Sequence, residues 1–259
     1  MKKHIIYLML FLLSTALSAS APDTLWTRTY GGINSDEGCC VCQTEDSNFI
    51  IAGSTNSFGA GKSDIYVIKV DLNGDTIWTK TYGGISNDYG EYICPTADNG
   101  FIITGYTGYT RYTDYDSTDV CLIKIDGNGD TLWTRTYGGT GDDEGYSVQP
   151  ISGGTDGFII AGWTKSFGAG SRRAYLIRTN SSGDTLWTRI YGESGDRAHS
   201  VSQNTDGGFI IGGDAYCRNG DAYIIRTDSV GVPSGPEVLV PTAEIIYHLY
   251  ARLRMVVSY

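Results

Sequence analysis

The sequence predicts an all-β protein, and specifically a four-bladed β-propeller of four-stranded antiparallel blades whose ring is closed by the N-terminal strand. Two observations predict this fold. A repeat runs through the chain, marked by Trp26, Trp78, Trp133 and Trp187, with a period of 52 to 55 residues. The repeat is also offset, because it starts with its last strand and ends without one. Units of this length that contain several short strands are typical of propeller blades.

Each repeat contains four predicted strands, which the first complete unit illustrates. A first strand lies in GCCVCQT (38–44). The second and third strands, NFIIAGST (48–55) and DIYVIKVD (64–71), are apolar and β-branched, as expected for strands that are buried on both faces. The turn DLNGD (71–75) leads into the fourth strand of GDTIWTKTYGG (74–84). In this strand large apolar and polar residues alternate, so the Trp, basic and Tyr side chains share one face.

The ends of the repeat predict how the ring closes. The copy DTLWTRTYGG (23–32) is a fourth strand with no first three strands of its own, and the last unit ends near Asp228 without a fourth strand. Unpaired strand edges promote aggregation. Pairing the N-terminal copy with the last unit removes both open edges, so residues 22–231 are predicted to form one closed domain.

The two termini are predicted to lie outside this domain. Lys2, Lys3, the apolar run IIYLMLFLLSTAL and the small residues SASA predict a secretory signal peptide over residues 1–21, with a membrane anchor as the alternative. The mature protein is therefore expected to be secreted or held at the cell surface, with no membrane span. Residues 232–259 are predicted to form a linker and a short tail, in which apolar residues at helical spacing indicate either a short helix or a truncated remnant.

Charge and motifs narrow the function. The net charge is −10, and loss of Lys2 and Lys3 with the signal makes it more negative by two, which argues against a nucleic-acid partner. The sequence contains no H-E-x-x-H, G-x-S-x-G or dinucleotide-binding motif. After signal removal His199 and His248 are the only histidines, so few residues could serve as the general base of a Ser/His or Cys/His mechanism.

The repeats resemble those of a known class. The segments DEGYSVQPISGGTDGFIIAGWT and YLIRTNSSGDTLWTRIYGE resemble repeats of secreted bacterial β-propeller-like proteins, and the resemblance covers about residues 23–231. It implies an exported surface protein, often one with a C-terminal sorting domain, although the tail here is too short for that domain. The resemblance implies an architecture rather than an activity.

The cysteines allow several interpretations. Six cysteines in an exported chain allow one or two disulfides, although their positions argue against a regular framework, and Cys121 replaces a repeated Tyr and is expected to be a small core residue. Cys39 and His199 occupy equivalent places in units one and four, so a closed ring would make them neighbours. A Cys/His metal site is one hypothesis for this pair, and small, buried or oxidised cysteines are the alternative.

A second metal hypothesis rests on four aspartates that recur before each first strand, where a propeller would gather them at one mouth of its channel: Asp36, Asp88, Asp143 and Asp196. Together these carboxylates could hold a structural divalent cation, the one cofactor that the sequence suggests. The alternative is that each aspartate accepts hydrogen bonds from the amides of its own loop.

The candidate ligand site is the irregular loop GYTGYTRYTDYDSTD (105–119), which is longer than its equivalents. Its candidate binding residues, together with one aromatic neighbour from the third unit, are Tyr109, Arg111, Tyr112, Asp114, Tyr115 and Trp163. Flat rings beside polar groups suit a sugar, and departures from a repeat often mark its binding face. The alternative is a loop that packs its own tyrosines onto the blade.

We therefore expect an exported, non-enzymatic binding or surface-interaction module. Its expected partners are extracellular carbohydrate or proteins of the cell envelope. Two alternatives stay open: a glycoside hydrolase that uses carboxylates at the channel mouth, and a purely structural repeat protein of the cell envelope.

Overall fold

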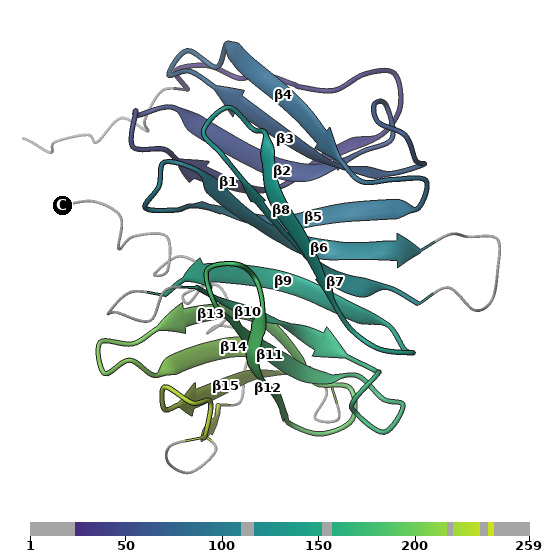
Figure 1. Ribbon diagram of the computed structural model, residues 1–259, viewed down its shortest axis with the longest axis vertical. Helices are drawn as coiled ribbons and strands as arrows, with labels where there is room; N and C mark the ends of the chain where they lie inside the picture. The colour runs from purple at the N-terminus through teal and green to yellow at the C-terminus, as the bar shows by residue number, and fades with distance from the viewer. Residues whose placement is uncertain (1–23, 110–116, 152–156, 217–219, 234–237, 241–259) are drawn as a thin grey trace, which may run out of the picture.

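The computed structural model describes residues 24–109, 117–151, 157–216, 220–233 and the backbone of 238–240. In these residues the protein is all-β, with four antiparallel sheets of four strands each and no α-helix. Each sheet corresponds to one sequence repeat; along the longest axis of the molecule sheet 1 lies at one end, sheet 2 in the middle, and sheets 3 and 4 side by side at the other end (Figure 1). The all-β class and the division into four antiparallel units that the sequence predicted are therefore confirmed.

The strands of each sheet pair in chain order. Sheet 1 consists of β1 (Asp36–Gln43), β2 (Phe49–Thr55), β3 (Asp64–Val70) and β4 (Thr76–Tyr82), and sheet 2 of β5 (Asn87–Pro95), β6 (Phe101–Tyr109), β7 (Asp119–Ile125) and β8 (Thr131–Tyr137). Sheet 3 consists of β9 (Asp143–Pro150), β10 (Phe158–Thr164), β11 (Arg173–Thr179) and β12 (Thr185–Tyr191), and sheet 4 of β13 (Arg197–Gln203), β14 (Phe209–Ala215), β15 (Asp221–Thr227) and β16 (Val238–Val240). We call β1, β5, β9 and β13 the first strands.

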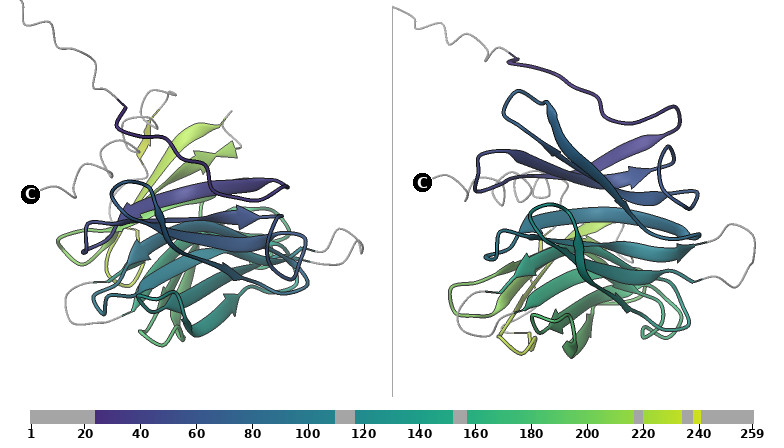
Figure 2. Two further views of the ribbon diagram at one scale, coloured as in Figure 1. Left: turned by 90° about the horizontal axis from the view of Figure 1, so that it is seen from above. Right: turned by 45° about the horizontal axis from the view of Figure 1, so that its top comes forward.

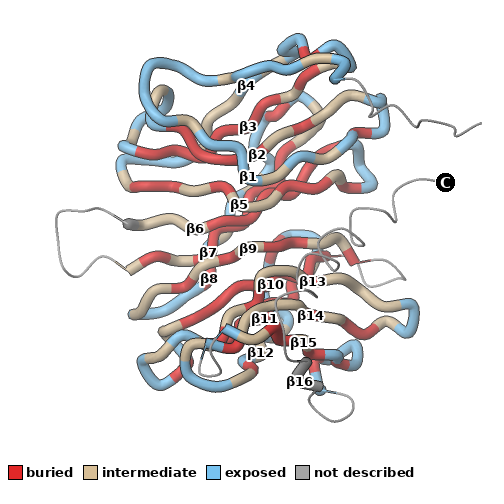
Figure 3. The backbone as a smooth tube through the Cα atoms, turned by 180° about the vertical axis from the view of Figure 1, so that it is seen from behind, coloured by how far each residue is buried: buried red, intermediate tan, exposed pale blue. Residues whose placement is uncertain are grey.

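The hydrophobic core consists of layers between neighbouring sheets. One cluster, which includes Ile50 and Ile103, joins sheets 1 and 2, and another, which includes Leu122 and Ile160, joins sheets 2 and 3. A third, around Leu176 and Phe209, joins sheets 3 and 4. The second and third strands are mostly buried, as Figure 3 shows, because both of their faces pack against neighbouring sheets.

A contact from each fourth strand to the next repeat fixes the order of the sheets. The hydroxyl of its last tyrosine donates a 2.7 Å hydrogen bond to a turn glycine's carbonyl, in the pairs Tyr30–Gly74, Tyr82–Gly129, Tyr137–Gly183 and Tyr191–Gly231. These glycines have positive φ, and a Cβ on any of them would meet the Trp of the same fourth-strand segment at about 3 Å. The turn glycine is therefore required both by its backbone conformation and by the ring that packs on it.

The N-terminal copy of this strand does not close the ring in the structure. Residues 24–30 form no strand and pair with no described strand; they lie against the turn at 71–75 of sheet 1, where Trp26 Nε1 donates to the Leu72 carbonyl at 2.8 Å. The fourth position of sheet 4 is taken by β16, from a segment that was predicted to be a linker. The closed four-bladed ring therefore stays a prediction, and the N-terminal segment is seen on sheet 1 instead of sheet 4.

Sheets 1 and 4 lie at opposite ends of the molecule, and the described strands show no sheet 4 to sheet 1 contact comparable with those between successive sheets (Figures 1 and 2). β1 is correspondingly the most open first strand, and the side chain of Val41 is 52% exposed. No helix in the described part of the chain is long and apolar enough to cross a membrane.

Tyr137→Phe should lower the free energy of unfolding by about 1 kcal/mol, because the buried Gly183 carbonyl loses its only side-chain donor from sheet 2. Chemical denaturation measures this change. Tyr216→Phe is the matched control, since Tyr216 is 68% exposed, and it should leave the unfolding midpoint unchanged. Equal, negligible effects of the two substitutions would contradict a structural role for the repeated tyrosine contact.

Candidate functional site

Each first strand contains one extra residue at the same place. The register with the second strand shifts between Gly38 and Cys40, and equivalent shifts occur in the other three sheets. The four bulge residues that this leaves without a partner in the ladder are Cys39, Glu91, Tyr146 and His199. β-bulges re-aim side chains and are common beside functional sites.

The bulge is encoded by the last glycine of the repeated IIAG, IITG or IIGG segment. A Cβ at Gly53 would lie 1.8 Å from the carbonyl oxygen of Glu37, and one at Gly162 would lie 1.9 Å from that of Glu144. Gly105 and Gly213 face the first strands of their own sheets in the same way. Only glycine lets the first-strand backbone approach so closely, so the repeat reproduces the bulge in every sheet.

Around each bulge lie two further variable positions, one on the first strand and one opposite it on the second strand. The cross-strand pairs are Glu37–Ser54, Tyr89–Tyr106, Glu144–Trp163 and Arg197–Asp214. We call these eight residues and the four bulge residues the bulge site. The scaffold residues repeat almost unchanged, whereas the bulge site carries a different set of side chains in every sheet, which is what a ligand site on a repeat scaffold requires.

Aromatic rings form two stacks in the bulge site. Tyr89 and Tyr106 stack within sheet 2, with ring centroids 4.9 Å apart and planes 28° from parallel. Tyr146 of sheet 3 stacks on His199 of sheet 4 at 5.3 Å and 24°. The second stack joins the bulge residues of sheets 3 and 4, and the first strands of successive sheets also contact one another.

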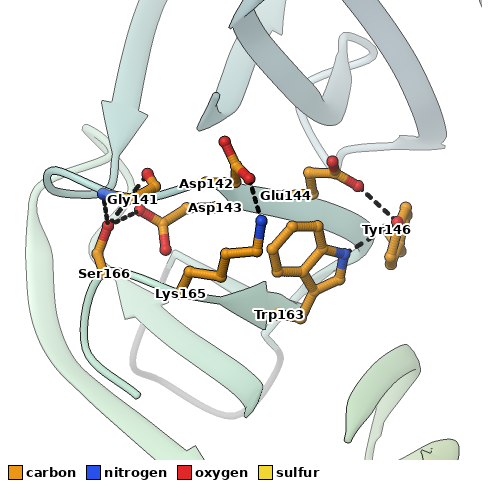
Figure 4. Close-up of polar contacts among 8 residues, drawn as sticks. All are labelled: Gly141, Asp142, Asp143, Glu144, Tyr146, Trp163, Lys165 and Ser166. Atoms are coloured by element: carbon orange, nitrogen blue, oxygen red, sulfur yellow. Dashed lines mark hydrogen bonds and ion pairs between the residues drawn. The ribbon is translucent and has the colours of Figure 1, made fainter. Parts of the chain in front are cut away.

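A hydrogen-bonded chain runs through sheet 3 (Figure 4). Trp163 Nε1 donates to Tyr146 Oη at 3.0 Å, and Tyr146 Oη donates to Glu144 Oε2 at 2.6 Å. The guanidinium of Arg172 lies 4.4 Å from the centre of the Trp163 ring. Trp163 is only 1% exposed, so this ring holds Tyr146 and Arg172 in place and is not the exposed stacking platform that the sequence predicted.

Two carboxyl groups of the site, those of Glu91 and Glu144, ionise less readily than usual. Burial, together with smaller effects of the negative charges of Glu144 and Glu37, raises the pKa of Glu91 to about 7 against the opposing effect of His199. Burial also raises the pKa of Glu144, although the hydrogen bond from Tyr146 and the charge of Arg172 oppose this. At neutral pH Glu91 is therefore partly protonated and can donate as well as accept a hydrogen bond.

Sheet 4 contributes a charged pair. Burial disfavours ionisation of Asp214, but the hydrogen bond from His199 and the charge of Arg197 outweigh it and hold the pKa of Asp214 below its usual value. Because this carboxylate can only accept, His199 Nε2 carries the proton in their hydrogen bond. The Asp214 contact and the stack on Tyr146 together fix the imidazole ring.

The four aspartates predicted to share a cation are each used by their own loop. The backbone amides that donate to them belong to Gly32 for Asp36, Gly84 for Asp88, Gly139 for Asp143 and Glu193 for Asp196. Ser166 Oγ also donates to Asp143 (Figure 4). No cluster of three or more His, Cys, Asp or Glu side chains suited to a metal occurs in the described residues. The geometry thus matches the loop-turn alternative.

The predicted loop site lies mostly outside the described residues. This applies to Arg111, Tyr112, Asp114 and Tyr115, while Tyr109 ends β6 and only its backbone is described. The loop follows β6 three residues after Tyr106, so the bulge site and the predicted loop site share one strand.

The described cysteines form no disulfide. Cys39 is exposed, Cys40 and Cys42 are half-buried, and Cys94 and Cys121 are buried. Cys121 packs in the core where other repeats have buried tyrosines, as the sequence predicted. Burial and the charges of Glu91 and Glu37 raise the pKa of the Cys39 thiol to about 12, so it is a poor nucleophile at neutral pH.

Comparisons with known proteins add little to the geometry. No protein-family model matches the chain, and no curated protein matches it. Among solved structures the fold is similar to that of a protein of unknown function from Bacteroides caccae, with 13% sequence identity and a TM-score of 0.46. The match covers 76% of this chain and 67% of that one.

Sequence reasoning missed Glu37, Glu91, Glu144 and the Arg197–Asp214 pair. The signal was present in the alignment of the repeats, where the third residue after each recurrent Asp differs in every unit and the first is Glu, Tyr, Glu and Arg in turn. It went unused because only the bulge shows that these two positions point toward neighbouring sheets.

Glu91→Gln should remove a pH dependence of stability. The pKa of Glu91 is raised in the folded state from 4.5 to about 7, so the folded protein binds the proton more tightly and its stability falls as pH rises through this range. The amide cannot ionise, so the free energy of unfolding of the variant should exceed that of the native protein by on the order of 2 kcal/mol at pH 8. Near pH 4 the two free energies should be equal. Urea unfolding at both pH values measures this. Glu45→Gln, at an exposed turn, should change neither value.

Asp143→Ala should lower the free energy of unfolding by about 1–3 kcal/mol, because the Gly139 amide and the Ser166 hydroxyl lose their acceptor. The melting temperature of the native protein should be the same in EDTA and in millimolar calcium. A melting temperature that rises with calcium in the native protein and not in the variant would instead favour the shared cation.

Proposed function

We propose that the protein is an exported binding module whose bulge site takes a carbohydrate. The observation that carries this proposal is the repeated bulge, which presents a different polar or aromatic side chain from each sheet onto one surface. Stacked tyrosines offer flat apolar faces, and the neighbouring carboxyl groups offer acceptors and, at Glu91, a donor. Sugars present the matching combination of C–H faces and hydroxyl groups.

We also propose that the four sheets are blades of a β-propeller. Three features support it: each unit is a four-stranded antiparallel sheet, the first strands of successive sheets contact one another, and the same tyrosine contact recurs at each step. In this arrangement the bulge site lies on the channel side of the blades.

The binding proposal predicts that an oligosaccharide from a panel of bacterial and plant glycans raises the melting temperature of the protein. Tyr89→Ala should then weaken binding at least tenfold in calorimetric titration, because it removes one ring of the Tyr89–Tyr106 stack. Tyr216→Ala, at an exposed ring outside the bulge site, should bind like the native protein. Equal affinities of the two variants would place the sugar elsewhere.

Glycoside hydrolysis is the second candidate. It is favoured by the raised pKa of Glu91 together with the electrostatic coupling to Glu144, since one protonated and one ionised carboxyl group are what such hydrolysis needs. If the protein releases reducing ends, Glu91→Gln and Glu144→Gln should each abolish release and leave binding intact. A sugar that binds and is never cleaved supports the binding module instead.

A further inference from the structure

The two ends of the array of sheets are incomplete in complementary ways. At the first end, residues 24–30 pack on sheet 1 as a fourth strand packs on the next sheet: Trp26 lies over Gly74, and Tyr30 donates to the Gly74 carbonyl at 2.7 Å. This segment has no third strand beside it among the described residues. Leu25 is 93% exposed, whereas the equivalent residues of the paired fourth strands are about half exposed.

At the other end, sheet 4 has a third strand whose neighbour differs from the other fourth strands. β16 pairs with only Ala222, Tyr223 and Ile224 of β15. Its sequence, Val-Leu-Val, has neither the Trp nor the Tyr of the repeat, and two prolines precede it at Pro233 and Pro236. Proline cannot donate to a strand ladder, so this segment is a weak substitute for the repeated strand.

One cross-strand pair shows the complementarity most directly. In sheets 1 to 3 the Trp of the fourth strand stands opposite a basic residue of the third strand, in the pairs Trp78–Lys69, Trp133–Lys124 and Trp187–Arg178. Arg226 occupies this place on β15, beyond the last residue paired with β16. Among the described residues, Trp26 thus has no basic residue opposite it on a third strand, and Arg226 has no Trp opposite it on a fourth strand.

The same chain does not bring these two ends together. Sheet 1 lies at one end of the molecule, sheets 3 and 4 lie side by side at the other, and the described strands of sheets 1 and 4 make no contact comparable with those between successive sheets (Figures 1 and 2). Each step from sheet to sheet uses the same tyrosine contact, so the rotation per step is built into the repeat. Four such steps leave the array open.

We propose that a second copy of the chain closes it. Residues 24–30 of each copy pair with β15 of the other and displace β16, so that two open arrays form one ring of eight sheets with two-fold symmetry. The register of the other sheets places Tyr30 opposite Ala222, Arg28 opposite Ile224 and Trp26 opposite Arg226. Sheet 4 of one copy then faces sheet 1 of the other through the interface that already joins sheets 1 to 2, 2 to 3 and 3 to 4.

The first test is the mass of the purified protein in solution, measured by light scattering after gel filtration. The mass should be twice that of the 28.1 kDa chain, less any cleaved signal. Trp26→Ala should shift the protein to the monomer, and Leu25→Ala, which changes an exposed neighbour, should stay dimeric. A native protein that is monomeric at micromolar concentration overturns the proposal.

The second test does not depend on the folding of the Trp26 variant. Arg28→Cys and Ile224→Cys are prepared as separate proteins, mixed and mildly oxidised. A covalent heterodimer linked through these two positions, identified by peptide mass mapping, supports exchange between copies. The control mixture replaces one variant with native protein, which contributes only the native cysteines. If the link forms only when both changes are in one chain and the product is a monomer, the strand closes its own ring and the proposal is wrong.

Discussion

The structure depends on the contact in which a tyrosine hydroxyl of each fourth-strand segment donates to the turn glycine of the next repeat, with a tryptophan packed over that glycine. The contact occurs four times with the same 2.7 Å distance. It requires an aromatic pair on one strand and a positive-φ glycine in the next turn, so the repeated LWTRTY and NGD segments are two halves of one interaction. The Trp and Tyr side chains of this pair pack on the next repeat and hold the sheets in order. They are therefore not part of the candidate ligand site, although they are the most conspicuous feature of the sequence.

Because the aromatic pair has this structural role, the candidate functional residues lie in the first and second strands, at the bulge site. A second repeated glycine, in the second strand, admits the first-strand backbone and forces a bulge. The bulge is constant, but the residue placed on it is not, and neither are the two positions beside it. Burial among neighbouring sheets then gives these side chains unusual chemistry: Glu91 and Glu144 resist ionisation, while Asp214 stays ionised through His199 and Arg197.

Much of the fold could be predicted from the sequence, because the repeat has strand periodicity and its turns contain glycine at the required places. Period-2 alternation correctly put Trp133 and Tyr137 on the face opposite Leu132, and the structure shows that Trp133 and Tyr137 contact the next repeat. The position of residues 24–30 could not be predicted in the same way, because the curvature of the array is set by three-dimensional packing and not by the pattern.

The candidate site was harder to predict. Trp163 was expected to be exposed but is buried, since its ring packs beside its cross-strand partner Glu144 and donates a hydrogen bond to the bulge residue Tyr146. The aspartates were predicted to lie before each first strand, but only Asp196 does; Asp36, Asp88 and Asp143 lie at the beginning of their strands, and their hydrogen bonds to loop amides are visible only in the structure.

The central claim is that the repeated contacts only build the scaffold and the variable bulge residues bind the ligand. Peptide-resolved hydrogen–deuterium exchange, with and without a glycan at saturating concentration, tests this most directly. The prediction is slower exchange in the first strands around residues 37–39, 89–91, 144–146 and 197–199, with the turns at 71–75, 126–130 and 180–184 unchanged. Protection confined to those turns and the fourth strands, or no protection with any glycan, would contradict it.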